Sequence, residues 1–416
     1  MSLIYSVNNY LNRYPYIKKK IKRVVQLTMV STLPEFKSEG DILSLAPNDS
    51  AHEYFFGYYD KSPWSADERY VLCLRTKDTW SDVAPHVPAD LLCIDQKTNE
   101  IRILGTTNSW NVQQGCMLQW LGPDYKSRVI YNDFRDGRYC SVIRNIVTGE
   151  KRELCAPVYA VSHSGKFALT LDFSRLHRLR PGYGYSNLPD NTEGIDIPSG
   201  PCIWRLDLEK NGLSPLLKYT DLTSFEPQPE MIGATHKVNH IMISPNDNRF
   251  MVLHRWFKGE RKYTRLLTID TYGKDIYNLS DDGMVSHCCW KNNEEIFAFE
   301  EKKSTGSGYY LMRDKTQEYK RYWPEINYDG HPSFSPDGRH IVFDRYPDIA
   351  RRAAVMIAKA DDDKGNSIKI VAKVFHPFKY DNDTRCDLHP RWSPDGSKIC
   401  FDSVFEGHRG LYVVKI

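Results

Sequence analysis

From about residue 40 onward, short runs of alternating apolar and polar residues are separated by clusters of turn-forming residues. This period of two predicts β-strands that each bury one face. Ser335-Pro336-Asp337-Gly338 and Ser393-Pro394-Asp395-Gly396 share one turn sequence, and Ser244-Pro245-Asn246-Asp247 is a close variant. Proline fixes φ at the second position of such a turn, and glycine tolerates the conformation that follows. The chain therefore repeats one kind of β-hairpin.

Seven turns of this kind can be placed along the chain, each between two apolar strands. The four looser turns are Ser65–Glu68, Gly122–Asp124, Ser162–Gly165 and Lys291–Asn293. The strands after the seven turns are predicted at Tyr70–Leu74, Arg128–Tyr131, Phe167–Leu171, Phe250–Leu253, Glu295–Phe299, His340–Phe343 and Lys398–Phe401. Seven units of four antiparallel strands predict an all-β fold, a seven-bladed β-propeller. A two-sheet sandwich would not explain the sevenfold recurrence.

The last unit ends at its third strand, Leu411–Ile416, so its fourth strand must come from elsewhere. Asp41–Leu45, just before the first unit, is predicted to supply it and so to close the propeller and remove an exposed sheet edge. The propeller domain is accordingly predicted at residues 40–416. The third unit carries a long insertion at about 174–200, which is predicted to form a lid or rim over the channel mouth.

Residues 1–33 form a separate arm, in which apolar residues recur at helical spacing with a break at Pro15. Basic residues occupy the other face from Lys18 to Arg23. Two interpretations stay open for this arm. In the first, the arm is structural, either a helix packed on the propeller or a partly disordered tail. In the second, residues 16–30 make peripheral contact with an anionic membrane surface.

Composition and charge narrow the classes of function. The net charge is only +3 and no RNA-binding motif is present, so a nucleic-acid partner is not expected. Ten scattered cysteines without a paired framework indicate reduced thiols. The sequence has no apolar run long enough to span a membrane and no recognisable signal peptide. These features predict a cytoplasmic location, with possible peripheral contact at the inner membrane face; the oligomeric state stays open.

Alignment of the units on their turns brings four histidines of consecutive units to one structural position. They are His240, His287, His331 and His389, and the other three units have Lys61, Leu118 and Val158 there. Because the innermost strand of each blade lines the central channel, these histidines are expected around one rim of that channel. A single such histidine is more often a structural hydrogen-bonding device, as in WD-type propellers. Four in succession favour a metal or acid/base site.

A second alignment places further polar residues at the end of each second strand. Asp344 and Asp402 lie thirteen residues after His331 and His389, and Glu300 lies thirteen after His287. Fourteen residues after His240 come His254 and Arg255. Cysteine, histidine and carboxylate ligands suit zinc. A metal site is therefore predicted at His331, Asp344, Cys386 and His389, with Asp402 or His287 as possible replacements.

The rim of the second unit offers hydrogen-bonding groups for a sugar. Gln114 and Asn132 are predicted to contact substrate there, together with His287 and Arg345 from later units. A phosphate-binding glycine loop and a serine nucleophile elbow are both missing from the sequence.

The repeated turns resemble those of TolB-type propellers, and three segments resemble the seven-bladed polysaccharide lyases of the oligogalacturonate and ulvan lyase-like families. The segments are Gln114–Trp120 with Tyr131–Asp133, Asn239–Ile241 with Leu253–Trp256, and Arg385–Trp392. The likeness covers about residues 45–416. It implies β-elimination on uronate-containing glycans, with His or Tyr as base and acid, an arginine, and in several cases a divalent metal such as zinc or manganese.

By role, the resemblance assigns neutralisation of the uronate carboxylate to Arg255 and acid/base work to His240 or His254. Tyr183 or Tyr185 would support them. Gln114 and Asn132 stand where histidines are expected in an active lyase, which leaves an alternative open. In this alternative, the protein is a non-catalytic propeller that binds a glycan or a partner in cell-envelope polysaccharide assembly. In both cases the expected ligand is an acidic oligosaccharide or polysaccharide.

Overall fold

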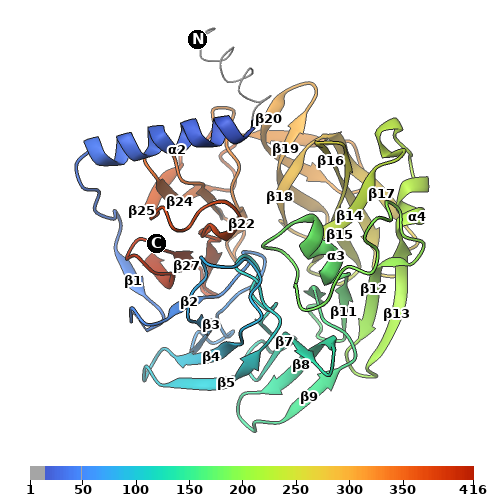
Figure 1. Ribbon diagram of the computed structural model, residues 1–416, viewed down its shortest axis with the longest axis horizontal. Helices are drawn as coiled ribbons and strands as arrows, with labels where there is room; N and C mark the ends of the chain where they lie inside the picture. The colour runs from blue at the N-terminus through green and yellow to red at the C-terminus, as the bar shows by residue number, and fades with distance from the viewer. Residues whose placement is uncertain (1–14, 48) are drawn as a thin grey trace.

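The computed structural model describes residues 15–47 and 49–416, and in these residues seven antiparallel four-stranded sheets surround a central axis (Figure 1). The predicted seven-bladed β-propeller is thereby confirmed. Among the described residues, α2 (Pro15–Thr32) is the helix that precedes the first strand. It begins at Pro15, because proline is well suited to the first helical position. Residues 1–14 of the predicted arm lie outside the described residues.

The first three blades follow one another along the chain. Blade one comprises β2 (Glu53–Phe55), β3 (Tyr70–Thr76), β4 (Ala89–Asp95) and β5 (Ile101–Thr107). Blade two comprises β6 (Gln119–Trp120), β7 (Arg128–Arg135), β8 (Arg138–Asn145) and β9 (Lys151–Leu154). Blade three comprises β10 (Ala160–Val161), β11 (Phe167–Thr170), β12 (Pro201–Asp207) and β13 (Gly212–Lys218).

The last four blades repeat the same order from the channel outward. Blade four comprises β14 (Thr235–Ile243), β15 (Arg249–Lys258), β16 (Arg261–Asp270) and β17 (Ile276–Gly283). Blade five comprises β18 (Val285–Trp290), β19 (Glu295–Lys302), β20 (Gly306–Arg313) and β21 (Tyr319–Tyr322). Blade six comprises β22 (Ser333–Phe334), β23 (His340–Arg345), β24 (Arg352–Lys359) and β25 (Lys369–Phe375). Blade seven comprises β26 (Arg391–Trp392), β27 (Lys398–Ser403), β28 (Gly410–Lys415) and β1 (Ile42–Ser44).

The propeller closes through a strand from the other end of the chain. β1 pairs antiparallel with β28, in a register that sets Ile42 opposite Val414 and Ser44 opposite Tyr412. Leu45 continues the connection by donating its amide to the carbonyl of Leu411. Blade seven thereby gains its fourth strand, so the first and last parts of the propeller form one sheet.

The repeated turns share a hydrogen-bond pattern that explains their sequence. Ser393 Oγ donates to Asp395 Oδ1 at 2.6 Å and accepts the amide of Lys398. Ser335 makes the same pair of bonds with Asp337 and with the amide of His340. Short polar side chains that bond the nearby backbone stabilise a turn. Each turn thus fixes the register between the innermost strand and the next.

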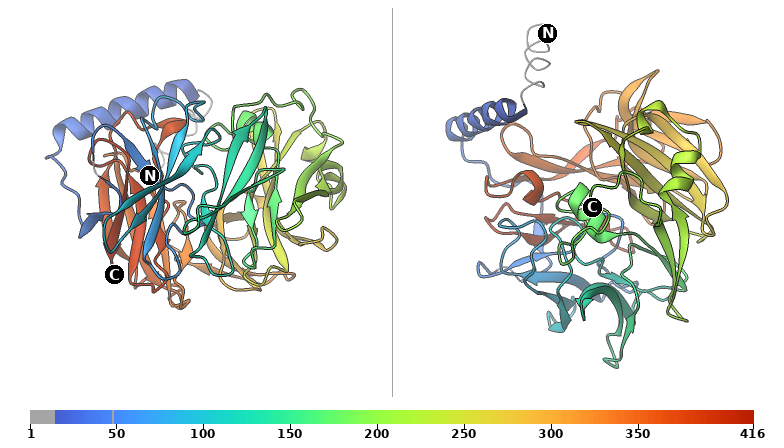
Figure 2. Two further views of the ribbon diagram at one scale, coloured as in Figure 1. Left: turned by 90° about the horizontal axis from the view of Figure 1, so that it is seen from below. Right: turned by 45° about the vertical axis from the view of Figure 1, so that its right-hand side comes forward.

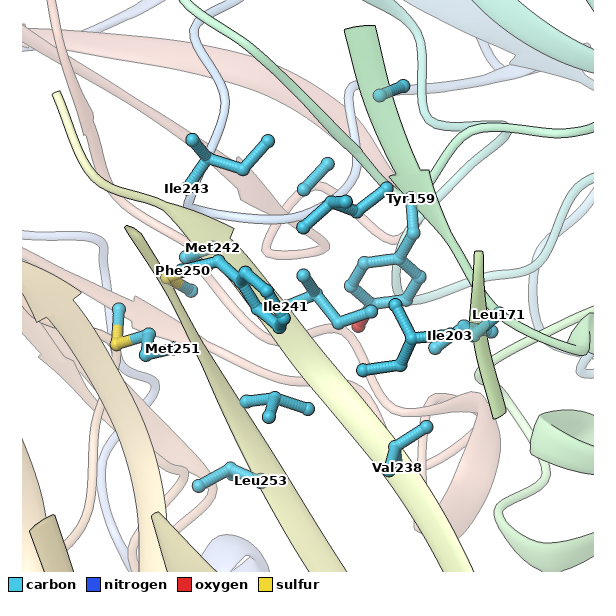
Figure 3. Packing of buried hydrophobic residues seen from close by; sticks show 14 of the residues in the cluster. Tyr159, Leu171, Ile203, Val238, Ile241, Met242, Ile243, Phe250, Met251 and Leu253 are labelled. Carbon is cyan, nitrogen blue, oxygen red and sulfur yellow. The ribbon is translucent and has the colours of Figure 1, made fainter. Parts of the chain in front are cut away.

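Tryptophans at the ends of inner strands join neighbouring blades. Their indole Nε1 groups donate to a backbone carbonyl of the preceding blade: Trp120 to Pro63, Trp290 to Met242, and Trp392 to Ser333. Apolar side chains fill the space between adjacent sheets. Figure 3 shows this packing where Tyr159 and Ile203 of blade three meet Ile241 and Phe250 of blade four. The cores lie between blades, which leaves the channel free for polar residues.

Insertions and links add short helices. The insertion in blade three begins with α3 (Phe173–Leu179), whose first amides are capped by Asp172. Two further helical turns precede blade four, α4 (Tyr219–Ser224) and η1 (Pro229–Met231), and η2 (Asn382–Thr384) precedes blade seven. α2 lies across the end of blade six, near β24 and β25 (Figures 1 and 2). Within the described part of the chain, every helix is too short or too polar to cross a bilayer.

Candidate active site in the central channel

The four predicted histidines gather in the channel, one from each of blades four to seven. The imidazole centroids of His287 and His331 are 4.0 Å apart, those of His331 and His389 4.4 Å, and those of His240 and His287 5.7 Å. All four side chains are buried. The alignment on the turns therefore brought together residues that lie in contact across four blades.

Two tyrosines of blade one, which the sequence analysis did not identify, fill the centre of this cluster. The ring of Tyr58 contacts His240, His331 and His389, with centroids 4.9–6.0 Å away, and its hydroxyl bonds His240 Nε2. Tyr59 contacts His331 at 5.0 Å and bonds the backbone of Cys288 through its hydroxyl. The channel is thus plugged by aromatic rings that carry titratable groups.

An ion pair of blade seven holds the backbone that carries these tyrosines. Asp402 accepts the amides of Phe56 and Gly57 and pairs with Arg391 at 3.0 Å. Arg391 in turn donates to the carbonyls of Gly57 and Tyr58. Both charged side chains are buried, and a buried pair is stabilising when further hydrogen bonds satisfy its atoms. The pair fixes Tyr58 against the histidines.

The backbone at two of the histidines is unusual. His240 has φ +57° and His389 has φ +46°, in the left-handed region that non-glycine residues seldom adopt. Such conformations persist where surrounding contacts over-determine them, and they are frequent at functional sites. The amide of His240 donates to the hydroxyl of Tyr159 at 3.0 Å, and Gln114 Nε2 donates to the same hydroxyl. Gln114 therefore supports the cluster from the second blade.

Three residues offer metal-ligand atoms within 4.8 Å of one another: His331, Asp387 and His389. The Nδ1 atom of His331 is bonded to both carboxylate oxygens of Asp344 at 2.9 Å. Within the described residues, the buried Nε2 atoms of His331 and His389 have no hydrogen-bond partner. A histidine held by a carboxylate, with its other nitrogen free, is the usual arrangement of a metal ligand. The residues therefore fit a divalent metal such as zinc or manganese.

This set differs from the predicted one in two members. Asp344 orients His331 rather than joining the ligand group. Cys386 packs in an apolar cluster with Tyr380 and Val404, and burial raises the pKa of its thiol to about 12. A thiol that stays protonated is a poor metal ligand. Asp387 takes its position, and Arg385 bonds both oxygens of the Asp387 carboxylate at 2.8–2.9 Å.

Arg255 is a buried cation beside the cluster. Its charge interacts with the phenols of Tyr58 and Tyr183 and lowers the pKa of His240 further. It donates a hydrogen bond to the carbonyl of Val285 at 3.2 Å, and among the described residues no carboxylate pairs with it. Lys237 is buried nearby, and burial together with the charges of Arg255 and Arg180 holds its pKa well below the usual value. This side of the channel is therefore electropositive.

The protonation states of the central pair follow from their burial. Burial, followed by the charge of Arg255, lowers the pKa of His240 well below 6.5, so the imidazole is neutral at pH 7. Burial and the neighbouring phenols raise the pKa of Tyr58 well above 10, so the phenol keeps its proton. A neutral imidazole bonded to a protonated phenol can accept or pass one proton.

The insertion of blade three sends one of its two tyrosines to the cluster. The ring of Tyr183 lies 6.0 Å from that of Tyr58 and 6.2 Å from that of His240. Tyr185 instead stacks on Phe173 at 4.4 Å, and its hydroxyl accepts from Asn132.

Two other predicted residues, Asn132 and His254, have structural partners. Asn132 bonds the amide and the carbonyl of Val158, so its amide group joins two blades and is not free for a sugar. His254 is bonded at both nitrogens, to His236 at 2.9 Å and to Arg265 at 3.2 Å. It lies beside His236 and Trp256 rather than among the four channel histidines.

Of the remaining two candidates, Arg345 lies outside the cluster and His287 belongs to it. Arg345 lies beside Asp348 and over the ring of Tyr328, away from the cluster. His287 does belong to the cluster, where its Nδ1 atom bonds Asp329 at 3.0 Å.

A cavity of about 710 Å³ opens at the other end of the channel, where the repeated turns lie. Tryptophans line its wall, among them Trp120, Trp290 and Trp392, and Tyr59 reaches it from the cluster. Since Tyr59 also contacts His331, one tyrosine separates this cavity from the histidines.

Comparisons with known proteins support the fold. The chain matches no family model and no curated protein. Among solved structures, an oligogalacturonate lyase from Vibrio parahaemolyticus is similar, with a TM-score of 0.60 and 11% identity over 92% of this chain and 99% of the other. An oligogalacturonate lyase in complex with manganese has a TM-score of 0.61 and 14% identity over 92% and 98%. The propeller of the Trilobed protease from Pyrococcus furiosus, with an open velcro topology, has a TM-score of 0.50 and 11% identity over 83% and 92%. At these identities the likeness shows a shared propeller fold.

Proposed function

We propose that the protein is a lyase that cleaves uronate-containing oligosaccharides by β-elimination in the central channel. The observation that carries this proposal is Arg255, a buried cation without a carboxylate partner among the described residues, next to Tyr58 and His240. Burying an unpaired charge is costly, so a buried arginine is expected to meet an anion in the functional state. A uronate carboxylate supplies that anion.

The chemistry requires this charge next to a base. The C5 proton of a uronate becomes acidic only when its carboxylate is neutralised, which Arg255 can do by two hydrogen bonds. The proton then passes to the Tyr58–His240 pair, the C5–H electrons form the C4–C5 double bond, and the C4–O4 bond breaks. The leaving oxygen takes a proton in return. Tyr183, in contact with both members of the pair, is suited to orient the sugar.

A divalent metal fits the part of the cluster that blades six and seven supply. His331, His389 and Asp387 would hold it, with Asp344 and Arg385 as their orienting partners. When bound, such an ion would share the negative charge that develops on the uronate carboxylate. The guanidinium of Arg255, which has no carboxylate partner among the described residues, contributes positive charge to the channel and favours an acidic ligand.

The test is turnover of short saturated oligogalacturonates by the full chain, with manganese or zinc added. We expect ultraviolet absorbance of the unsaturated uronate product to rise with time. Arg255→Met should lower kcat/KM by about 10²–10³, as loss of a transition-state charge contact does. No new absorbance with galacturonate, glucuronate or guluronate oligomers would exclude the lyase.

A second candidate is a propeller that binds an acidic glycan without cleaving it. The observation in its favour is the burial of the proposed proton-transfer pair. Tyr58 is only 2% and His240 only 3% exposed, which restricts their contact with a bound sugar. Calorimetry with the same oligosaccharides distinguishes the two functions. Saturable binding that Arg255→Met abolishes, without any product, would establish the binding function in place of the lyase.

A further inference from the structure

α2 turns its apolar side chains away from the propeller. Ile17, Ile21 and Val24 follow the spacing of one helical face. The exposed fractions are 68% for Tyr16, 48% for Ile17, 43% for Ile21, 62% for Val24 and 49% for Leu27. A helix that packs on a protein body normally presents its apolar stripe to the core. The reversed orientation leaves a contiguous apolar surface without a partner inside the described chain.

Polar contacts hold the helix in this orientation. Arg23 forms an ion pair with Asp381, and its guanidinium lies 4.8 Å from the centre of the Phe378 ring. Gln26, on the same side of the helix, is buried. Asp381 and Phe378 belong to the segment between β25 and β26, which leads directly to the metal-ligand candidates Asp387 and His389. The helix therefore sits on the face of the propeller at which the histidine strands begin.

All charged side chains of the helix are positive. Five of the six residues from 18 to 23 are cations: Lys18, Lys19, Lys20, Lys22 and Arg23. The helix from Pro15 to Thr32 contains no Asp or Glu. The whole chain carries a net charge of only +3, so positive charge is concentrated here. An outward apolar face with lysines beside it is the pattern of helices that lie in the plane of an anionic membrane surface.

We propose that α2 docks the protein on an anionic lipid bilayer, with Ile17, Ile21 and Val24 inserted among the acyl chains. The lysines would contact lipid phosphates, and long lysine side chains can reach them from the flank of a helix. A second copy of this chain is the other occupant to consider. Its α2 offers no carboxylate to balance the four lysines, so pairing of the two helices would bring like charges together.

The experiment measures co-sedimentation of the full-length protein with vesicles of two compositions, phosphatidylcholine alone and phosphatidylcholine with phosphatidylglycerol. We expect the protein to pellet with the anionic vesicles and to be released by salt, since charge attraction is screened. The triple variant Ile17→Ser, Ile21→Ser, Val24→Ser should bind at least about tenfold more weakly. A matched control, Val147→Ser with Ile232→Ser, removes exposed apolar side chains from the propeller and should bind as the unchanged protein does.

Three results would overturn the proposal. The first is no binding to anionic vesicles at any salt concentration. The second is equal binding by the triple variant and the control. The third is that the unchanged protein is a dimer in solution and does not bind vesicles, whereas the triple variant is a monomer. That result would assign the surface to a second copy of the chain. The substituted side chains are exposed, so thermal unfolding should be the same in all variants and loss of fold would not explain a loss of binding.

Discussion

Blades four to seven and blades one to three share one scaffold but use the channel differently. Each of the later blades places a histidine in or just before its inner strand, and each of these histidines contacts the one in the next blade. At the same position, blades two and three have Leu118 and Val158, which are buried in apolar cores between blades. One backbone position therefore serves packing in one half and chemistry in the other.

The half without channel histidines still supplies essential parts of the cluster. Tyr58 and Tyr59 of blade one fill the space that the four histidines surround. Gln114 of blade two and Tyr159 of blade three are bonded to each other, and Tyr159 accepts the amide of His240. The comparison shows that the site is built across the channel, with the proton-carrying pair shared between blades one and four.

The largest expected effect comes from removing the blade-four member of that pair. His240→Ala should lower kcat/KM for a uronate oligosaccharide by about 10²–10⁴, because proton transfer would lose its acceptor. His163→Gln changes an exposed histidine of blade three and should leave activity as it is. Initial rates of absorbance increase measure both. Equal activity of His240→Ala and the unchanged protein would remove the catalytic distinction between the two halves.

The equivalent position in blade two should show the opposite pattern. Leu118→Ala removes a buried side chain and should lower the free energy of unfolding by about 2–5 kcal/mol, through lost burial and a cavity. Metal affinity at the later blades should not change. Denaturant unfolding and calorimetric titration with manganese measure the two properties. A loss of metal binding without a loss of stability would contradict this division.

A smaller effect separates the metal ligands from their neighbours. Asp344→Asn removes the carboxylate that orients His331 and should weaken metal binding by about 10–100-fold. Cys386→Ser changes a side chain that packs beside Tyr380 and should bind metal normally. Titration of both variants with zinc and manganese measures this. Metal loss in Cys386→Ser would restore the ligand set expected from the sequence.

The last prediction concerns a buried histidine between blades six and seven that is outside the cluster. Burial, followed by the charges of Arg351 and Arg409, lowers the pKa of His376 to about 3. The unfolded chain therefore binds one more proton than the folded one between pH 6.5 and 3. The free energy of unfolding should therefore decrease as the pH is lowered through this window, by about 1.4 kcal/mol per pH unit for this group. Above pH 6.5 this contribution should not change with pH. His376→Leu should have a shallower slope in denaturant unfolding across the window.

The fold could be predicted because its determinants are local. Ser-Pro-Asp-Gly turns satisfy their own backbone groups, so their positions in the sequence predict where each hairpin reverses. The strands between them have a period of two that needs no distant contact to be recognised. β1 is less conspicuous as a strand, but the missing partner of β28 pointed to it.

The site could be predicted only where strand alternation continued unbroken. Asp344, thirteen residues after His331, does face it. The extra residue between His240 and His254 turns His254 to the opposite face, since one residue reverses the side of a strand. Cys386 lies three residues before His389, an odd separation that puts the two side chains on opposite faces of an extended segment, whereas Asp387 lies two residues before it and approaches it. Tyr58 was missed because it precedes the aligned position of blade one, Lys61, by three residues.

Closure through β1 and β28 has a consequence for synthesis of the protein. The two strands pair residues from opposite ends of the propeller sequence, Ile42 with Val414. Six blades can form as the chain leaves the ribosome, because each is built from consecutive strands. The seventh must wait until β28 emerges, and the closing loop is then the longest in the molecule. Until that moment a nascent chain carries an open circle with an unpaired strand at its edge, the stage at which it is most prone to aggregate.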